Sequence, residues 1–152
     1  LDIKKDDRVL DAFCGIGNFS LPIARAGAFV YGVEYSESSV RRARTNAELN
    51  NIQNCSFQAC DLASSSQKIE ALGDVNKIVL DPPRSGASEF ISGLPIQNIE
   101  RIVYVSCNPV TFAKDLSVLV KKGFELKVAG VVNMFPHTTH VESLALLSRT
   151  GN

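Results

Sequence analysis

The sequence has no net charge, because sixteen acidic residues balance sixteen basic ones. No overall electrostatic field therefore draws the chain to nucleic acid, although this balance does not exclude an RNA substrate. No apolar run approaches the roughly 18 residues that a membrane-spanning helix requires, so no membrane association is expected. The chain also contains no internal repeat and no low-complexity segment. These absences predict an ordinary globular domain.

The four cysteines are scattered, and no two of them form a Cys-x-x-Cys pair. This spacing gives no indication of a zinc site or a thioredoxin-type redox motif, so no bound metal is expected. Reduced thiols are typical of cytosolic proteins, which predicts a cytoplasmic location. His137 and His140 have no third clear ligand nearby in the sequence, which favours structural hydrogen bonding over metal binding.

At 152 residues the chain has the size of one domain that can bury a hydrophobic core. Short apolar runs alternate with helical patterns at regular spacing. This alternation predicts an α/β fold with a mostly parallel sheet and helices on both faces. The predicted strands are 9–13, 29–34, 54–59, 77–80, 101–105, 124–132 and 141–148. The predicted helices are 18–26, 36–50, 63–72, 88–98 and 109–122, and the helix over 88–98 should be interrupted near Gly93 and Pro95.

The chain is organised around a glycine turn at Gly15 and Gly17, between the first apolar run and a helix that Asn18 would cap. Glycines at such a turn allow a tight bend and the close approach of a ligand. The dinucleotide fingerprint G-x-G-x-x-G would have a third glycine where Ser20 stands. Its absence argues against a nicotinamide cofactor, because that glycine serves close packing beneath a pyrophosphate.

Glu34 ends the second strand, about 20 residues after the glycine turn, where an acidic residue suits the hydroxyls of a ribose. The alternative is a surface charge that merely closes the strand. A ribose acceptor without the pyrophosphate glycine fits a nucleoside cofactor that has no diphosphate, and S-adenosylmethionine is the common one. Asp61 also follows a strand, at the edge where open α/β sheets place ligand contacts.

Three more loops should meet the glycine turn at this edge, and they carry an acid, a thiol and a second acid. Asp81 begins a proline-stiffened Asp-Pro-Pro-Arg loop that could accept an N–H group of a flat base. Cys107 precedes a helix N-terminus, which favours a thiolate nucleophile, whereas a lone cysteine is otherwise a small buried hydrophobe. Glu142 opens the last strand within an apolar segment, where it is either a general base or an edge-strand charge.

At these loops the sequence resembles the S-adenosylmethionine-dependent RNA uracil-5-methyltransferases, above all the branch that modifies 23S ribosomal RNA, with the tRNA branch as a near relative. The resemblance implies a class I methyltransferase (Rossmann-like) sheet of seven strands whose last strand is antiparallel. It rests on segments 10–19, 81–86, 105–109 and 134–143. It implies that the cofactor pocket is lined by Phe13, Asn18, Glu34, Asp61 and Asp81.

The resemblance also implies a covalent mechanism. The thiolate of Cys107 would add to carbon 6 of uracil, which makes carbon 5 nucleophilic enough to take the methyl group. Glu142 would then remove the proton from carbon 5, and elimination would release the cysteine. The target base must leave its stack to reach such a pocket.

The same family implies a longer protein, of which residues 1–152 would be the methyltransferase domain. An N-terminal RNA-binding part would precede Leu1, and in the ribosomal branch it would include an iron–sulfur segment. A glutamine that contacts the cofactor would also lie upstream. We therefore expect this domain alone to keep its fold and much of the cofactor pocket but to show weak or no RNA methylation. RNA is the expected partner, and we expect a monomer with no protein partner.

Two other functions fit the sequence. An N-methyltransferase would use the Asp81 loop to hold an amino group and would need no nucleophilic cysteine. A non-catalytic module would bind cofactor or RNA without turnover. Arg41, Arg42 and Arg44 in the second helix do not decide the matter, since their pattern favours a solvated face over an RNA-binding patch.

Overall fold

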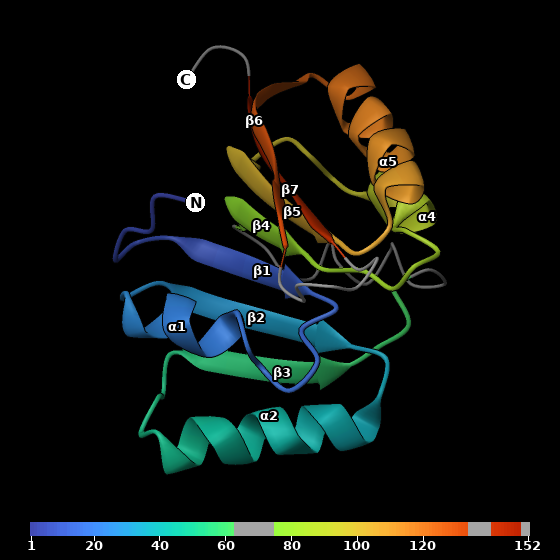
Figure 1. The fold of residues 1–152 in the computed structure, drawn as a ribbon. Coiled ribbons are helices and arrows are strands. Elements are labelled where there is room, and N and C mark those ends of the chain that lie inside the picture. The colour runs from blue at the N-terminus through green and yellow to red at the C-terminus, as the bar shows by residue number, and fades with distance from the viewer. Residues whose placement is uncertain (63–74, 134–140, 150–152) are drawn as a thin grey trace.

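The computed structural model describes residues 1–62, 75–133 and 141–149 (Figure 1). The helix predicted over 63–72 lies outside the described residues, as do His137 and His140. The described helices are α1 (Ser20–Arg25), α2 (Glu37–Leu49), α4 (Ser88–Gly93) and α5 (Pro109–Lys121). The strands are β1 (Arg8–Ala12), β2 (Phe29–Glu34), β3 (Cys55–Ala59), β4 (Lys77–Leu80), β5 (Arg101–Ser106), β6 (Phe124–Val132) and β7 (Glu142–Arg149).

The seven strands form one sheet in the order β3-β2-β1-β4-β5-β7-β6. Strands β1 to β5 are parallel, and β7 is antiparallel to both of its neighbours. The predicted α/β class, with its antiparallel last strand, is confirmed. The chain first builds outward from β1 to β3 and then returns to place β4 on the other side of β1. Ligands bind open α/β sheets at the carboxyl ends of the strands beside such a switch point.

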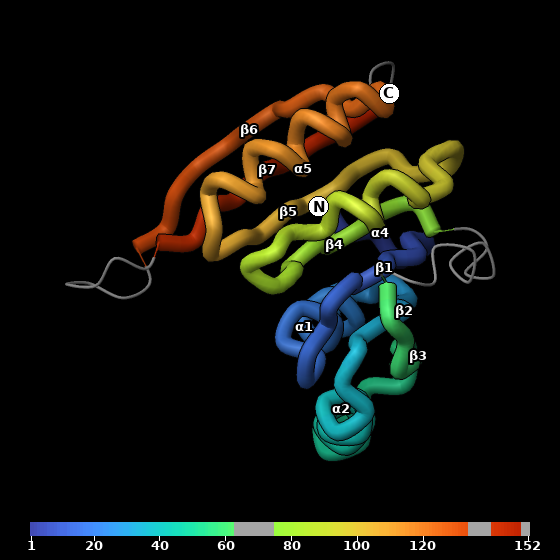
Figure 2. The backbone as a smooth tube through the Cα atoms, turned by 90° about the vertical axis from the view of Figure 1, so that its right-hand side faces the viewer, coloured from blue at the N-terminus to red at the C-terminus, as the bar shows by residue number. Residues whose placement is uncertain are grey.

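The core follows from the alternation of side chains along the central strands. Leu10 of β1 and Ile78 of β4 belong to the cluster that includes buried residues of α4 and α5, whereas Val9 and Val79 pack with Ala24 of α1. Figure 2 shows α2 at one end of the sheet and β6 with α5 at the other. Within the described parts of the chain, no helix combines the length and apolar character needed to cross a membrane.

Two helices differ from the sequence prediction at their ends. Helix α1 has Phe19 rather than Asn18 at its N-cap, with no side-chain cap, because the glycine turn continues by backbone hydrogen bonds into the helix. The helix predicted over 88–98 ends at Gly93, where the sequence predicted an interruption, and does not resume as α-helix after it. Leu94 is extended there because proline follows it, and the residue before a proline is disfavoured in helical conformation.

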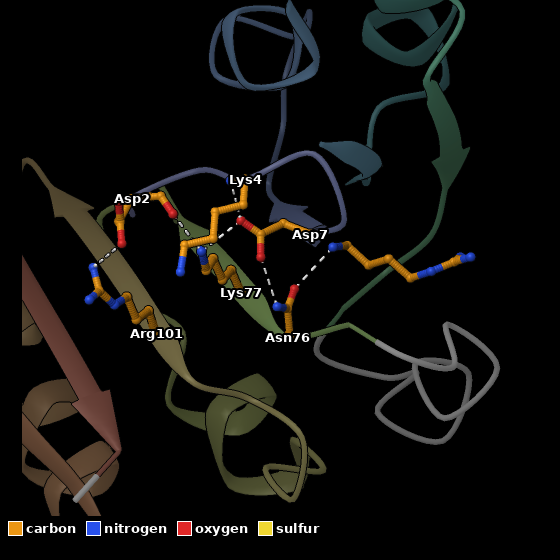
Figure 3. A network of polar contacts seen from close by, with 7 residues as sticks. Asp2, Lys4, Asp7, Asn76, Lys77 and Arg101 are labelled. Carbon is orange, nitrogen blue, oxygen red and sulfur yellow. Dashed lines mark hydrogen bonds and ion pairs between the residues drawn. The ribbon is translucent and has the colours of Figure 1, made fainter. Parts of the chain in front are cut away.

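At the amino-terminal edge of the sheet, a buried ion pair ties the lead-in segment to β4 (Figure 3). The Nζ atom of Lys77 lies 2.6 Å from Oδ2 of Asp7, and both residues are buried. The Asp7 carboxylate also accepts hydrogen bonds from the Asn76 amide and the backbone N–H of Lys4. Burial alone would raise the pKa of Asp7, but the hydrogen bonds from Lys77, Asn76 and Lys4 outweigh it and hold the pKa below its usual value.

Candidate active site

A cavity of about 760 Å³ opens at the carboxyl ends of the strands, beside the switch point between β1 and β4. Phe13 follows β1, Glu34 ends β2, Asp61 follows β3 and Asp81 follows β4, and all four line this cavity. The structure therefore brings together four residues that the sequence assigned to a cofactor pocket. The cavity is also lined by Pro83, residues 85–90 and Lys114. Residues 83–86 belong to the loop on which the resemblance rests, whereas 87–90 and Lys114 were not singled out from the sequence.

Phe13 is held in a left-handed backbone conformation, with φ of +67°. This conformation costs a non-glycine residue roughly 1–2 kcal/mol, so the surrounding packing must impose it. Its ring meets that of Phe90 edge to face, with 6.0 Å between the ring centroids. The ring thus joins the end of β1 to α4 across the cavity wall.

The two glycines of the turn have different surroundings. Gly15 has φ of +54°, and a Cβ atom added to it would meet nothing within 4 Å. Gly17 has φ of +90°, and a Cβ atom added to it would lie 3.5–3.6 Å from the side chains of Leu21, Ala43 and Phe57. Gly17 and Asn18 line a separate hollow of about 220 Å³ instead of the main cavity. The predicted cofactor residues therefore do not all line one cavity, and Gly15 lines neither of the two.

Glu34 is fixed at the cavity by its backbone neighbours. Its Oε2 atom accepts the N–H of Gly15 at 3.2 Å, and its Oε1 atom accepts the N–H of Ser36 at 2.9 Å. Each carboxylate oxygen can accept a further hydrogen bond, because it has two lone pairs. The side chain is therefore oriented in advance and can still receive a pair of ligand hydroxyls.

Asp11, the last residue but one of β1, is a buried acid next to the site that the sequence reasoning missed. It is fully buried, and its Oδ2 atom accepts the hydroxyl of Ser20 at 2.5 Å. Within the described residues, its Oδ1 atom has no hydrogen-bond partner. The pKa of Asp11 is raised to about 7, mainly because burial disfavours the charged form, and the charges of Asp81 and Glu34 add to the rise. The hydrogen bond from Ser20 acts in the opposite direction and lowers the pKa. An acid inside a buried apolar run was the signal that could have revealed it.

Several carboxyl groups lie at or near the cavity, among them those of Glu34 and Asp81. Burial, followed by the nearby charge of Glu142, raises the pKa of Asp81. In the part of the chain that the structure describes, no lysine or arginine forms an ion pair with Asp11, Glu34 or Asp81. Buried carboxylates without partners are costly. Such a site fits a ligand that brings positive charge and hydroxyl groups.

Cys107 and Glu142 come together through the pairing of β5 with β7. Ser106, which ends β5, lies opposite Ser143 of β7. Cys107 and Glu142 each lie one residue beyond this pair, at the same end of the two antiparallel strands. Both residues are half-buried. Neither lines the main cavity, but Glu142 is close enough to Asp81 to affect its pKa.

The backbone on either side of Cys107 is fixed by hydrogen bonds. The hydroxyl of Ser106 accepts the N–H of Asn108 at 3.1 Å. The side chain of Asn108 accepts the N–H of Val110 at 3.1 Å and so caps α5, with Pro109 in the first turn as predicted. The thiol is thus carried by a rigid turn immediately before a helix of 13 residues.

Comparison with curated proteins gives close relatives along nearly the whole chain. Over 98% of its length, this chain is 52% identical to the 23S rRNA (uracil(1939)-C(5))-methyltransferase RlmD of Aromatoleum aromaticum. It is 51% identical, again over 98%, to the protein of the same name from Hahella chejuensis. The chain spans only 35% and 34% of the lengths of these two relatives.

Comparison with solved structures gives the same family. The tRNA (uracil-54, C5)-methyltransferase of Pyrococcus abyssi, solved in complex with S-adenosyl-L-homocysteine, superposes with a TM-score of 0.81. It is 33% identical, and the match covers 95% of this chain and 35% of that one. The sequence model of the tRNA (Uracil-5-)-methyltransferase family matches residues 1–150. The chain therefore belongs to the tRNA (uracil-5-)-methyltransferase family.

Proposed function

We propose that this chain is the catalytic domain of an enzyme that transfers a methyl group from S-adenosylmethionine to carbon 5 of a uridine in 23S ribosomal RNA. The observation that carries the proposal is the meeting of Cys107 and Glu142 where β5 pairs with β7, next to Asp81 at the cavity. The names of the bacterial relatives support this substrate, and S-adenosyl-L-homocysteine in the P. abyssi structure supports this cofactor.

The cavity fits the proposed cofactor chemically. Glu34 can accept the two ribose hydroxyls, and the carboxyl groups of Asp11 and Asp81 suit the positive charges of an ammonium and a sulfonium. The Oδ1 atom of Asp11 is the buried acceptor that still lacks a donor among the described residues. The bound cofactor would supply the methyl group. Phe13 and Asp61 would complete its pocket, whereas direct contacts from Gly15, Gly17 and Asn18 remain predictions.

In the proposed reaction, Cys107 and Glu142 act in turn on one uracil ring. The sulfur of Cys107 forms a bond to carbon 6, and the electrons of the carbon 5–carbon 6 double bond move toward carbon 5 and the adjacent carbonyl. After carbon 5 has gained its methyl group, Glu142 takes the proton from carbon 5. The double bond then re-forms, and the carbon–sulfur bond breaks to release Cys107.

Covalent trapping of the full-length protein tests the role of the thiol. A 23S RNA fragment containing 5-fluorouridine should form an adduct that survives denaturation, because fluorine cannot leave carbon 5 as a proton does. Cys107→Ala should abolish the adduct, whereas Cys55→Ala, a half-buried cysteine on β3, should leave it intact. An active Cys107→Ala enzyme would instead support an N-methyltransferase that uses the Asp81 loop.

The same assay separates the base from the nucleophile. Glu142→Gln should form a lasting adduct even with ordinary RNA, since the proton on carbon 5 then has no acceptor. Normal release from the Glu142→Gln enzyme would remove Glu142 from the base role. Adducts with tRNA but not with 23S RNA would point to the tRNA branch, as in the P. abyssi relative.

We also propose that these 152 residues form the methyltransferase domain of a longer protein, whose upstream part binds RNA and holds any iron–sulfur cluster. The share of the relatives that the chain covers, about one third, supports this. We propose that the enzyme acts as a cytoplasmic monomer. The full-length protein should methylate RNA readily and the domain alone weakly or not at all; equal turnover by the two would contradict the proposal.

A further inference from the structure

Asp115 is a buried carboxylate on α5 that the proposed reaction does not use. Only 1% of its surface is exposed. Its Oδ2 atom accepts two hydrogen bonds, one from the backbone N–H of Ala87 at 2.7 Å and one from the hydroxyl of Tyr104 at 2.5 Å. Ala87 precedes α4 and Tyr104 belongs to β5, so one oxygen atom joins three parts of the fold.

The loop from Asp81 to Ala87 packs directly on this carboxylate. Gly86 has φ of +81°, and a Cβ atom added to it would lie 2.7 Å from Oδ2 of Asp115 and 3.1 Å from Cβ of Thr111. Glycine is therefore required both by the backbone conformation and by the close approach to α5. Gly86 and Ala87 line the main cavity, so α5 supports its wall from behind.

A second set of contacts ties the same loop to the start of α5. The carbonyl oxygen of Arg84 accepts the side-chain amide of Asn108 at 2.9 Å and the hydroxyl of Thr111 at 3.2 Å. Asn108, Thr111 and Asp115 are spaced three and four residues apart, which places them on one face of the helix. One face of α5 thus holds the loop at both Arg84 and Ala87.

We propose that Asp115 is a positioning residue that locks the Asp81 loop onto α5 and so fixes the cavity wall relative to Cys107. Cys107 lies next to Asn108, the N-cap of α5. The contacts that hold the Asp81 loop to this helix therefore also set the position of the loop relative to the thiol. The inference rests on the proposed methylation of uridine. That reaction requires a sulfur atom, a ring carbon and a methyl donor in one alignment, and a misplacement of about 1 Å can cost on the order of 100-fold in rate.

Both donors to Asp115 suit a charged acceptor. Hydrogen bonds to an ionised group are stronger than those between neutral groups. Burial, together with the hydrogen bond to Asp115, raises the pKa of Tyr104, so its hydroxyl stays protonated and keeps donating. A neutral amide at position 115 could still accept both bonds through its one oxygen, but more weakly. Alanine could accept neither.

The test uses the full-length enzyme with Asp115→Ala, Asp115→Asn and Tyr104→Phe. The maximal rate of uridine RNA methylation is divided by the concentration of cofactor sites, which are titrated with S-adenosyl-L-homocysteine, to give kcat per site. Asp115→Ala should lower kcat per site by about 10- to 100-fold. Asp115→Asn should recover most of this loss, and Tyr104→Phe should show a smaller decrease than Asp115→Ala. Binding of S-adenosyl-L-homocysteine should weaken less than kcat falls.

Asp7→Asn is the matched control. Asp7 is also a buried carboxylate with several hydrogen bonds, but it lies at the other edge of the sheet. Its variant should lose thermal stability and keep kcat per site. A residue with a merely structural role behaves in this way, because it changes the number of folded sites and not the rate of each.

Unchanged kcat per site in Asp115→Ala, or no recovery in Asp115→Asn, would overturn the proposal. If Asp115→Ala does not fold, Asp115→Asn and Tyr104→Phe decide the question, and unchanged kcat in both would overturn it. Amide hydrogen exchange at Ala87 tests the contact without any activity and should accelerate in Asp115→Asn. Failure of the wild-type enzyme to methylate uridine, with Ala87 exchange as expected, would instead refute the proposed function.

Discussion

Carboxyl groups at the two edges of the sheet have opposite surroundings. At the amino-terminal edge, Asp7 is paired with Lys77, and its pKa is lowered (Figure 3). At the carboxyl-terminal edge, Asp11 and Asp81 have raised pKa values, and no cationic side chain in the described residues pairs with them. At the first edge, the carboxylate of Asp7 pairs with a cationic side chain of the same chain, Lys77. On the proposed function, the carboxyl groups at the second edge would receive a cationic ligand instead.

Breaking the ion pair at the amino-terminal edge should have the largest effect on stability. Lys77→Met leaves Asp7 buried with no cationic partner in place, and removing one partner of a buried pair costs about 3–5 kcal/mol. Urea unfolding of the chain would measure this loss. Lys127→Ala, which breaks an exposed pair with Glu125, should cost about 1 kcal/mol or less. Equal losses in the two variants would contradict the comparison.

The pH dependence of stability should distinguish the two edges. Because the folded-state pKa of Asp11 is raised to about 7, the folded chain binds more protons than the unfolded chain between about pH 4 and pH 7. Stability should therefore fall by a few kcal/mol as the pH rises through this window, and Asp11→Asn should remove that fall. For Asp7 the sign is reversed, because a lowered pKa gives stability that is lost as the pH falls through it.

Measuring urea unfolding at a series of pH values tests both statements. Asp11→Asn should remove the fall in stability between about pH 4 and pH 7. Asp7→Asn should lower stability at neutral pH and remove the loss on the acid side. A curve for Asp11→Asn that matches the wild type would show that Asp11 does not titrate in this window.

At the carboxyl-terminal edge, Glu34→Gln should weaken S-adenosyl-L-homocysteine binding by about tenfold, or 1.4 kcal/mol. Glutamine offers only one acceptor oxygen where Gly15, Ser36 and the proposed ribose need several. Calorimetric titration of the folded chain would measure the change. Glu37→Gln, an exposed acid at the start of α2, is the control and should bind as the wild type does. Equal binding by Glu34→Gln would remove Glu34 from the ribose role.

The smallest expected effect is that of Ser20→Ala, which removes the donor to Asp11. The loss of this hydrogen bond should raise the pKa of Asp11 further and cost about 1 kcal/mol at pH 8. Carbon-detected NMR titration of the carboxyl group would follow the pKa. An unchanged pKa would mean that Ser20 does not influence the charge of Asp11.

Much of the fold could be predicted, because the strands of a parallel sheet buried on both faces appear in the sequence as short apolar runs. Phe13, Glu34, Asp61 and Asp81 could be grouped in advance, since each lies at the end of a parallel strand and such ends share one edge. The start of α1 differed because backbone hydrogen bonds made a cap at Asn18 unnecessary. The interruption near Gly93 and Pro95 was predictable, because the proline after Leu94 is a local signal.

What the sequence could not show depends on tertiary contacts. The neighbouring positions of Cys107 and Glu142 require β7 to lie between β5 and β6, an order that no local pattern contains. Asp115 looked like any helical acid, because its partners Ala87 and Tyr104 are distant in the chain. Asp11 is different: its place within an apolar run could have been recognised.

The insertion of β7 between β5 and β6 also has a consequence for biosynthesis. A nascent chain that has left the ribosome only as far as β6 already contains the glycine turn, the acidic cavity residues and Cys107. It still lacks the strand that brings Glu142 beside the thiol, and long-range strand pairing of this kind is slow to form. On the proposed mechanism, an incomplete chain would have the nucleophile Cys107 but not the base Glu142. It could form the covalent adduct with uridine but could not release it until β7 has joined the sheet.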